Sequence, residues 1–390
     1  MSSWLPAAAD VLPADAERAL LVGRVHTPDG PSVVVLRGGE LVDITAAFPT
    51  MSALTEHADP ASAARAADGP SLGSLEDAWR NTDPDTRDER GIYLLSPIDL
   101  HVIKASGVTF PVSMLERVIE ERARGEASSA EGIRHTVQAA IGGDIAELVP
   151  GSEAAMRLKD VLIDQGLWSQ YLEVGIGPDA EIFSKAPVLS SVGSGHDIGV
   201  LAESRWNNPE PEVVIVVAST GRIVGATLGN DVNLRDIEGR SALLLGRAKD
   251  NNASAAVGPF IRLFDDGFSL DDVRHETVAL RVTGDDGFSM EASSHMEQIS
   301  RDPADLAAQA AGRHHQYPDG FVLYLGTMFA PTDDRDEPGR GFTHHVGDVV
   351  TIASSKLGSL VGRVTHSEDA APWTFGIRAL MANLAGRGLL

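Results

Sequence analysis

Residues 210 to 259 carry the pattern that most restricts how this chain can fold. They read EPEVVIVVASTGRIVGATLGNDVNLRDIEGRSALLLGRAKDNNASAAVGP. Residues 213 to 217 are an unbroken β-branched run, which predicts a buried strand, and residues 223 to 228 predict a second strand. The Ser-Thr-Gly-Arg sequence between them is typical of a turn. We therefore expect a β-hairpin whose strands lie in the core.

Three carboxylates are expected to meet at the open end of this hairpin. Alternate residues of a strand share a face, so Glu210 and Glu212 point the same way. A turn centred on residues 220 and 221 would place Asp231 opposite Glu210. Facing carboxylates destabilise a sheet, and a hard divalent cation such as magnesium, manganese or calcium is their usual compensation. The alternative is a solvated acidic rim, and an odd-length loop would separate the three acids.

Composition narrows the classes of function. The chain has 390 residues, enough for two domains, with 43% hydrophobic and 23% charged residues, as in globular proteins. A net charge of -24 opposes binding to nucleic acid or to anionic lipid. Because the chain has no cysteine, thiolate zinc sites and cysteine nucleophiles are excluded. The first residues lack signal-peptide features and no apolar segment is long enough to span a bilayer, so we expect a cytoplasmic protein without a membrane partner.

The remaining sequence predicts two domains. Residues 20 to 45 alternate short β-like runs with glycine turns, which indicates an antiparallel meander, and a polar stretch follows to residue 90. We place the small N-terminal β-domain at residues 1 to 90 and the main domain at residues 91 to 390. Helices are expected over residues 113 to 125, with Ser113 as the N-cap, and over residues 152 to 166 and 303 to 312.

Three motifs resemble those of the fumarylacetoacetate hydrolase superfamily. They are the pair Glu210 and Glu212, the GNDVNLRD run at residues 229 to 236, and Lys249 upstream of Gly258-Pro259. The resemblance extends more weakly over residues 92 to 364. The segments WNNPEPEVVIV and SSHMEQISRD make the chain similar to the sugar-acid branch, which includes 2-keto-3-deoxy-D-arabinonate dehydratases and diketo-deoxy-sugar-acid hydrolases.

This resemblance implies a fold, a metal and a set of site residues. The implied fold is α+β, a β-rich roll of mixed sheets with peripheral helices that follows the small antiparallel β-domain, and the implied assembly is a homodimer. Glu210, Glu212 and Asp231 would hold Mg²⁺ or Mn²⁺. The other residues that the resemblance places at or near the site are Lys185, Arg235, Glu238, Lys249 and Thr327.

One segment departs from the pattern of the superfamily. Many hydrolytic members carry an Asn-Tyr-x-x-His-x-x-Glu segment in a mobile lid, where the His-Glu pair activates water. The equivalent residues 109 to 116 read TFPVSMLE, so Ser113 replaces the histidine and Glu116 is retained. Serine cannot serve alone as the base that activates water. We therefore favour dehydration over hydrolysis.

The preferred hypothesis is a dehydratase of a 2-keto-3-deoxy sugar acid, a small 2-oxo acid whose enolate the metal would stabilise. We assign Lys249, Glu116 and Arg235 to catalysis, with a lowered pKa expected for Lys249 beside the metal. Substrate binding is assigned to Lys185, Glu238, Thr327 and Ser113. The alternatives are a carbon-carbon hydrolase of acylpyruvates or 2,4-diketo acids, and an inactive metal-binding relative.

Overall fold

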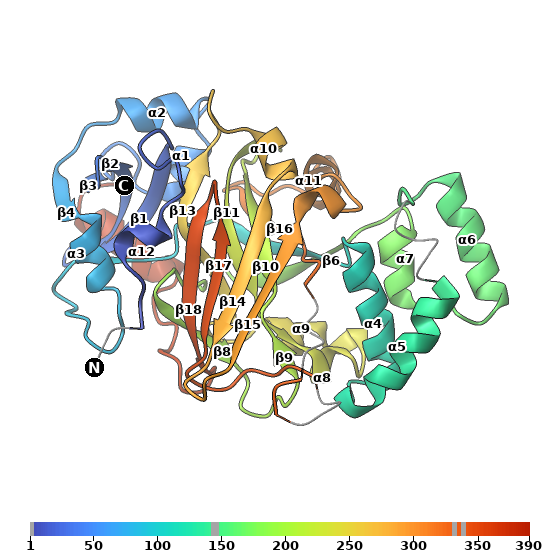
Figure 1. Cartoon of the computed structure of the whole chain (residues 1–390). Helices are drawn as coiled ribbons and strands as arrows, with labels where there is room; N and C mark the ends of the chain where they lie inside the picture. The colour runs from blue at the N-terminus through green and yellow to red at the C-terminus, as the bar shows by residue number, and fades with distance from the viewer. Residues whose placement is uncertain (1–3, 142–147, 330–333, 337–340) are drawn as a thin grey trace.

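A computed structural model describes residues 4–141, 148–329, 334–336 and 341–390 of the chain. Two sheets form its body, and a group of helices, α4 to α7, projects from one side (Figure 1). In the described residues the larger sheet has 11 strands in the order β4-β3-β2-β1-β13-β11-β10-β16-β6-β7, with β5 paired to β1. Its strands are β1 Leu21–Thr27, β2 Gly30–Arg37, β3 Glu40–Asp43, β4 Ser71–Ser74, β5 Tyr93–Leu94, β6 Val102–Gly107, β7 Glu181–Ala186, β10 Pro211–Val217, β11 Ile223–Asp231, β13 Ala255–Leu263 and β16 Phe321–Tyr324.

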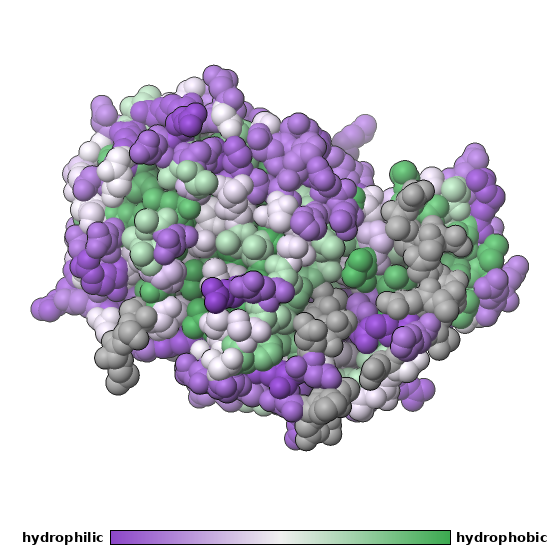
Figure 2. Space-filling model, viewed as in Figure 1, coloured by the Kyte–Doolittle hydropathy of each residue, from purple (hydrophilic) through white to green (hydrophobic). Residues whose placement is uncertain are grey.

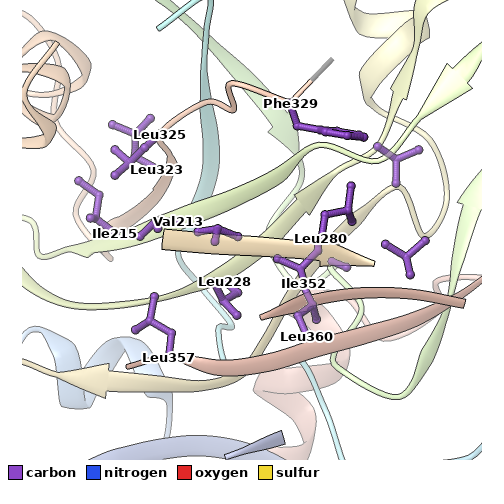
Figure 3. Close-up of a cluster of buried hydrophobic side chains, with 14 of the residues drawn as sticks. Val213, Ile215, Leu228, Leu280, Leu323, Leu325, Phe329, Ile352, Leu357 and Leu360 are labelled. Carbon is purple, nitrogen blue, oxygen red and sulfur yellow. The ribbon is translucent and has the colours of Figure 1, made fainter. Parts of the chain in front are cut away.

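The smaller sheet packs against the middle of the larger one. Its strands run in the order β15-β14-β17-β18-β8, and β10, β11 and β13 contact β14, β17 and β18 across the interface. Figure 3 labels members of the core between the sheets, among them Val213 from β10 and Leu280 from β14. The bounds are β8 His196–Val200, β14 Thr277–Thr283, β15 Ser289–His295, β17 Val349–Ser354 and β18 Gly358–His366, and a separate pair consists of β9 Asn207–Asn208 and β12 Asn233–Leu234. The expected α+β roll of mixed sheets is confirmed.

The hairpin of β10 and β11 is buried on both faces, as its unbroken apolar sequence predicts. Val213 and Ile215 face the core between the sheets, whereas Val214 and Val216 face a second core that includes Leu54. Leu54 belongs to α1 (Met51–Thr55), which together with α2 (Pro60–Ala66) supplies part of that second core. This burial fixes the register of the hairpin, because a shift by one residue would exchange the two faces.

The N-terminal meander is confirmed, since β1, β2 and β3 pair antiparallel in sequence order. Strand β1 also pairs with β13, so these strands continue the large sheet. The division of the chain at residue 90 stays a prediction.

Helix α4 begins earlier than expected. It spans Pro111–Ala123, and Phe110 is its N-cap. Proline is pre-organised for the first turn of a helix and holds the preceding residue extended, so the helix starts there. Ser113 lies inside the first turn and donates a hydrogen bond to the Phe110 carbonyl at 3.0 Å. The assignment of Ser113 as N-cap is therefore wrong.

The other two helices expected from the sequence are confirmed as α6 and α11. The remaining helices surround the sheets. Their bounds are α3 Leu75–Arg80, α5 Ala127–Ile141, α6 Glu153–Asp164, α7 Gln170–Ile176, α8 Arg235–Glu238, α9 Leu245–Lys249, α10 Leu270–Arg274, α11 Pro303–Ala310 and α12 Ile377–Gly386, with short 3-10 turns at Ala8–Val11, Ala242–Leu244 and Met296–Gln298. Hydrophilic residues cover much of the face drawn in Figure 2, with smaller hydrophobic patches between them. Among the described residues, no helix combines the length and the apolar character needed to cross a bilayer.

Candidate metal centre and its cavity

The three predicted carboxylates meet at the open end of the β10–β11 hairpin. Pro211 pairs with Asn230, and the Asp231 amide donates to the Glu210 carbonyl at 3.1 Å, so Asp231 lies opposite Glu210 as predicted. The register shifts only between residues 216 and 217, near the turn. One oxygen from each of Glu210, Glu212 and Asp231 lies within 4.8 Å of the others.

This donor set fits a hard divalent cation. All three carboxylates are buried, and burial together with the charges of Asp231 and Glu210 raises the pKa of Glu212 well above its usual range. A cation between the three oxygens would remove the repulsion that causes this shift. The Glu212 carboxylate is further oriented by the backbone amide of Gly326, which donates to it at 2.6 Å.

Lys249 lies against the same carboxylates. Its Nζ is 2.5 Å from Glu210 Oε2 and 3.2 Å from Asp231 Oδ2. Burial lowers the pKa of Lys249, but the charges of Asp231 and Glu210 outweigh it, so the pKa is raised. This shift arises from the protein groups alone, so the lowered pKa expected for Lys249 beside a bound cation stays a prediction.

Lys185 lies behind the carboxylates rather than in front of them. Its side chain is fully buried and does not line the cavity described below. Its Nζ is 2.9 Å from Asp231 Oδ1 and donates to the carbonyls of Lys249 at 2.5 Å and Val232 at 3.2 Å. These contacts suit Lys185 to positioning Asp231 and the end of α9, and its contact with substrate stays a prediction.

Helix α4 covers the carboxylates and forms one wall of a small cavity. Arg117 on this helix lies 2.5 Å from Glu210, 2.8 Å from Glu120 and 3.0 Å from Glu238. Arg235, at the start of α8, donates from Nε to Glu120 at 2.7 Å, which joins α4 to the body of the protein. Arg117 and Glu120 were not predicted, although residues 113, 116, 117 and 120 share one face of a helix and this spacing could have indicated them.

The retained glutamate of the lid segment is engaged elsewhere. Arg134 donates to the two Glu116 oxygens at 2.9 and 2.7 Å, and Arg235 lies 3.6 Å away. Ser113 also lines the cavity. Among the residues that the structure describes, no histidine lines the cavity.

Glu181, at the start of β7, is a third residue that sequence reasoning missed. It lines the cavity, and burial followed by the charge of Glu238 raises its pKa to about 7. Nothing in the local sequence marks it, because its neighbours along the chain resemble an ordinary strand.

The cavity has a volume of about 30 Å³, which holds no more than a few water molecules. The predicted Thr327 and Glu238 line the cavity as well. The full lining is Ser106, Gly107, Val108, Ser113, Glu116, Arg117, Glu120, Glu181, Phe183, Asn208, Glu210, Glu212, Asp231, Arg235, Glu238, Lys249, Gly326, Thr327 and Phe329.

The chain is similar to known proteins in part of its sequence and in its fold. No family profile matches the chain. A 2-dehydro-3-deoxy-D-arabinonate dehydratase from Saccharolobus solfataricus is 32% identical over 184 residues, which are 46% of this chain and 57% of that protein. A probable 2-keto-3-deoxyxylonate dehydratase from Haloferax volcanii is 31% identical over 195 residues, 50% of this chain and 63% of that protein. The chain thus matches less than two thirds of the length of either relative.

Solved structures share the fold over most of the chain. The apo form of a 2-keto-3-deoxy-D-arabinonate dehydratase has a TM-score of 0.63 at 21% identity and covers 89% of this chain and 99% of its own. The same enzyme complexed with magnesium and 2,5-dioxopentanoate has a TM-score of 0.62 at 20% identity, with the same coverage. A fumarylacetoacetate hydrolase from Exiguobacterium antarcticum has a TM-score of 0.53 at 16% identity and covers 89% of this chain and 100% of its own.

The fold is therefore shared with these dehydratases and with a hydrolase of the superfamily whose motifs the sequence resembles. The two sequence relatives and two of these structures carry the names of sugar-acid dehydratases, the branch that the sequence motifs resemble.

Proposed function

We propose that this protein is a magnesium-dependent hydro-lyase that dehydrates a 2-keto-3-deoxy sugar acid of the 2-keto-3-deoxy-D-arabinonate type. The observation that carries the proposal is the buried triad of Glu210, Glu212 and Asp231 with Lys249 against it, at the wall of a cavity. The names of the two sequence relatives support the same reaction. Manganese is the alternative metal. That the protein forms a homodimer, lies in the cytoplasm and acts in pentose breakdown stays a prediction.

Glu210, Glu212 and Asp231 would hold the cation. When bound, a divalent cation acts as a Lewis acid that stabilises negative charge on the oxygen of a 2-oxo group. The chain's own residues then have to remove a proton from C3, assist the loss of the C4 hydroxyl and exclude water. Tautomerisation afterwards gives a 2-oxo acid semialdehyde.

We assign the C3 proton to Glu181. A general base works best when its pKa is near the working pH, and the pKa of Glu181 is about 7. Glu116, which we expected from the sequence to act in catalysis, is held by Arg134 in a two-point ion pair. Its carboxylate is therefore less available than that of Glu181.

Lys249 is the proton donor in this proposal. Its raised pKa keeps the ammonium charged, so it can protonate the departing C4 hydroxyl and release it as water. Arg235 acts through Glu120 and α4, and Thr327 and Ser113 contribute hydroxyl groups to the cavity.

Hydrolysis of a diketo acid is less well supported by these contacts. It requires a base that activates water, and at the position of the superfamily's histidine Ser113 donates to a backbone carbonyl. The neighbouring Glu116 is tied to Arg134.

The test is product analysis by carbon-resolved NMR. The protein is incubated with Mg²⁺ and, in separate tubes, with 2-keto-3-deoxypentonates and with an acylpyruvate, and an EDTA-treated sample is the control. We expect a five-carbon semialdehyde without pyruvate, formed only with metal. Pyruvate plus an acid from the acylpyruvate would instead establish the hydrolase, and no product in any tube would favour the inactive relative.

The proposed base has a matched control on α4. Glu181→Gln should lower kcat by about 10²–10⁴-fold. Glu116→Gln should lower it far less. The reverse order would return the catalytic role to Glu116.

A further inference from the structure

The wall of the cavity around the metal centre is strongly acidic. Seven carboxyl groups line it, against the three cations Arg117, Arg235 and Lys249. Arg134 and Lys185, behind the wall, pair with Glu116 and Asp231, so with a bound divalent cation the formal charges balance and no further cation among the described residues faces the ligand. An anionic substrate can therefore bind with one carboxylate at the metal. The site has little capacity to bind a second carboxylate of the same substrate.

The cations of the wall are already paired. Arg117 contacts Glu120, Glu210 and Glu238, all within 3.0 Å. Lys249 is bound to Glu210 and Asp231, and Arg235 to Glu120. A second carboxylate on a ligand would have to displace one of these pairs, and an unpaired buried charge is costly.

Asn208 supplies a buried acceptor in the same wall. It is 2% exposed and follows Asn207 on the short strand β9. Its Nδ2 donates to the Pro209 carbonyl at 2.8 Å, while its Oδ1 has no hydrogen-bond donor among the described residues. A buried acceptor without a donor is destabilising, so a ligand that brings a donor gains from this position.

Glu238 lies in the same wall and is also an acceptor. Its side chain is buried and contacts Arg117 through one oxygen, and a carboxylate has further lone pairs to offer. The groups that satisfy such acceptors without adding negative charge are hydroxyls.

We propose that Asn208 and Glu238 bind hydroxyl groups of the substrate, so that the site selects hydroxylated 2-oxo acids and rejects those with a second carboxylate. This inference rests on the proposed function only for the binding of the 2-oxo acid end at the metal. It deepens that function by naming the residues that choose the substrate.

The test compares three unreactive five-carbon ligands that share the 2-oxo acid end. They are 5-hydroxy-2-oxopentanoate, 2-oxopentanoate and 2-oxoglutarate, and each is titrated into the Mg²⁺-loaded protein by calorimetry. A hydrogen bond that satisfies the buried Asn208 acceptor corresponds to about tenfold in Kd, so the hydroxylated ligand should bind about tenfold more tightly than 2-oxopentanoate. 2-Oxoglutarate should bind most weakly. Equal or tighter binding of 2-oxoglutarate would overturn the inference.

Binding and turnover separate the two proposals. A protein that dehydrates a keto-deoxy acid but binds 2-oxoglutarate as well as the hydroxylated ligand refutes only the selection by Asn208 and Glu238. A protein that shows the expected ranking but forms no semialdehyde refutes only the proposed reaction.

Two variants assign the effect to residues. Asn208→Leu removes the acceptor and should abolish the preference for the hydroxylated ligand over 2-oxopentanoate, whereas Asn208→Asp keeps an acceptor and should retain it. Glu238→Gln should reduce the discrimination against 2-oxoglutarate. Circular dichroism checks the folding of each variant. If Asn208→Leu does not fold, the Asn208→Asp variant and the ligand ranking of the unaltered protein still test the proposal. Unchanged preferences in folded variants would contradict the assignment.

Discussion

Glu181→Gln should change how the stability of the protein depends on pH. In the folded protein burial and the charge of Glu238 raise the pKa of Glu181 from 4.5 to about 7. Because each pKa unit corresponds to about 1.4 kcal/mol, the shift corresponds to roughly 3 kcal/mol. Glutamine keeps the size of the side chain and cannot ionise, so the variant lacks this contribution.

The sign follows from proton binding. Between pH 4.5 and about pH 7 the folded protein holds a proton on Glu181 that the unfolded chain has released. The free energy of unfolding therefore falls as pH rises through this window and is constant above it. Relative to the unaltered protein, Glu181→Gln should gain roughly 3 kcal/mol between pH 4.5 and pH 8.

Urea unfolding at a series of pH values, with EDTA present in every sample, measures this difference. Subtracting the two curves removes the titrations that both proteins share. A difference that stays constant from pH 4.5 to pH 8 would show that the Glu181 carboxyl is not held protonated, and its assignment as the base would lose its support.

Three further predictions concern the metal centre. Glu212→Gln should weaken Mg²⁺ binding by about 100-fold or more in calorimetry. It should not lower the melting temperature in EDTA, because the raised pKa of Glu212 already favours its neutral form. A large loss of stability in EDTA would contradict this. Lys185→Met should destabilise the protein by up to about 3–5 kcal/mol in urea unfolding, since it removes one of the two cations paired with buried Asp231, and an unchanged midpoint would refute the positioning role. Mg²⁺ at about 100 times its Kd should stabilise the unaltered protein by about 2.7 kcal/mol. Titrations with calcium or manganese in the same thermal assay rank the metals. A melting temperature that does not change with any of the three cations would argue against the site.

The metal triad could be predicted from the sequence because its geometry is local. Glu210, Glu212 and Asp231 lie on one hairpin, whose register follows from a short turn and from two buried faces. The same holds for the meander and for the helices α6 and α11, where caps and hydrophobic spacing are sequence-local signals. Helix α4 starts at Pro111, before the predicted start at Ser113, because proline favours the first helical turn.

The wall of the cavity depended on tertiary structure. Glu181 comes from β7, Asn208 from β9 and Arg117 from α4, and only the packing of these distant segments brings them around the triad. The pKa shifts of the site residues also arise from this packing. The direction of the Lys249 pKa shift depends on the balance between burial and two neighbouring carboxylates, and the pKa of Glu181 depends on a charge 57 positions along the chain, on Glu238.

The sequence by itself thus determined the hairpin, its three acids and the oxygen-only chemistry of the site, because strand alternation and turn position are properties of neighbouring residues. Tertiary structure decided that Lys185 lies behind Asp231, that Glu116 is paired with Arg134, and that the cations of the cavity are already neutralised. Electrostatic interactions act through space between residues far apart in the chain, so no local pattern could have shown them.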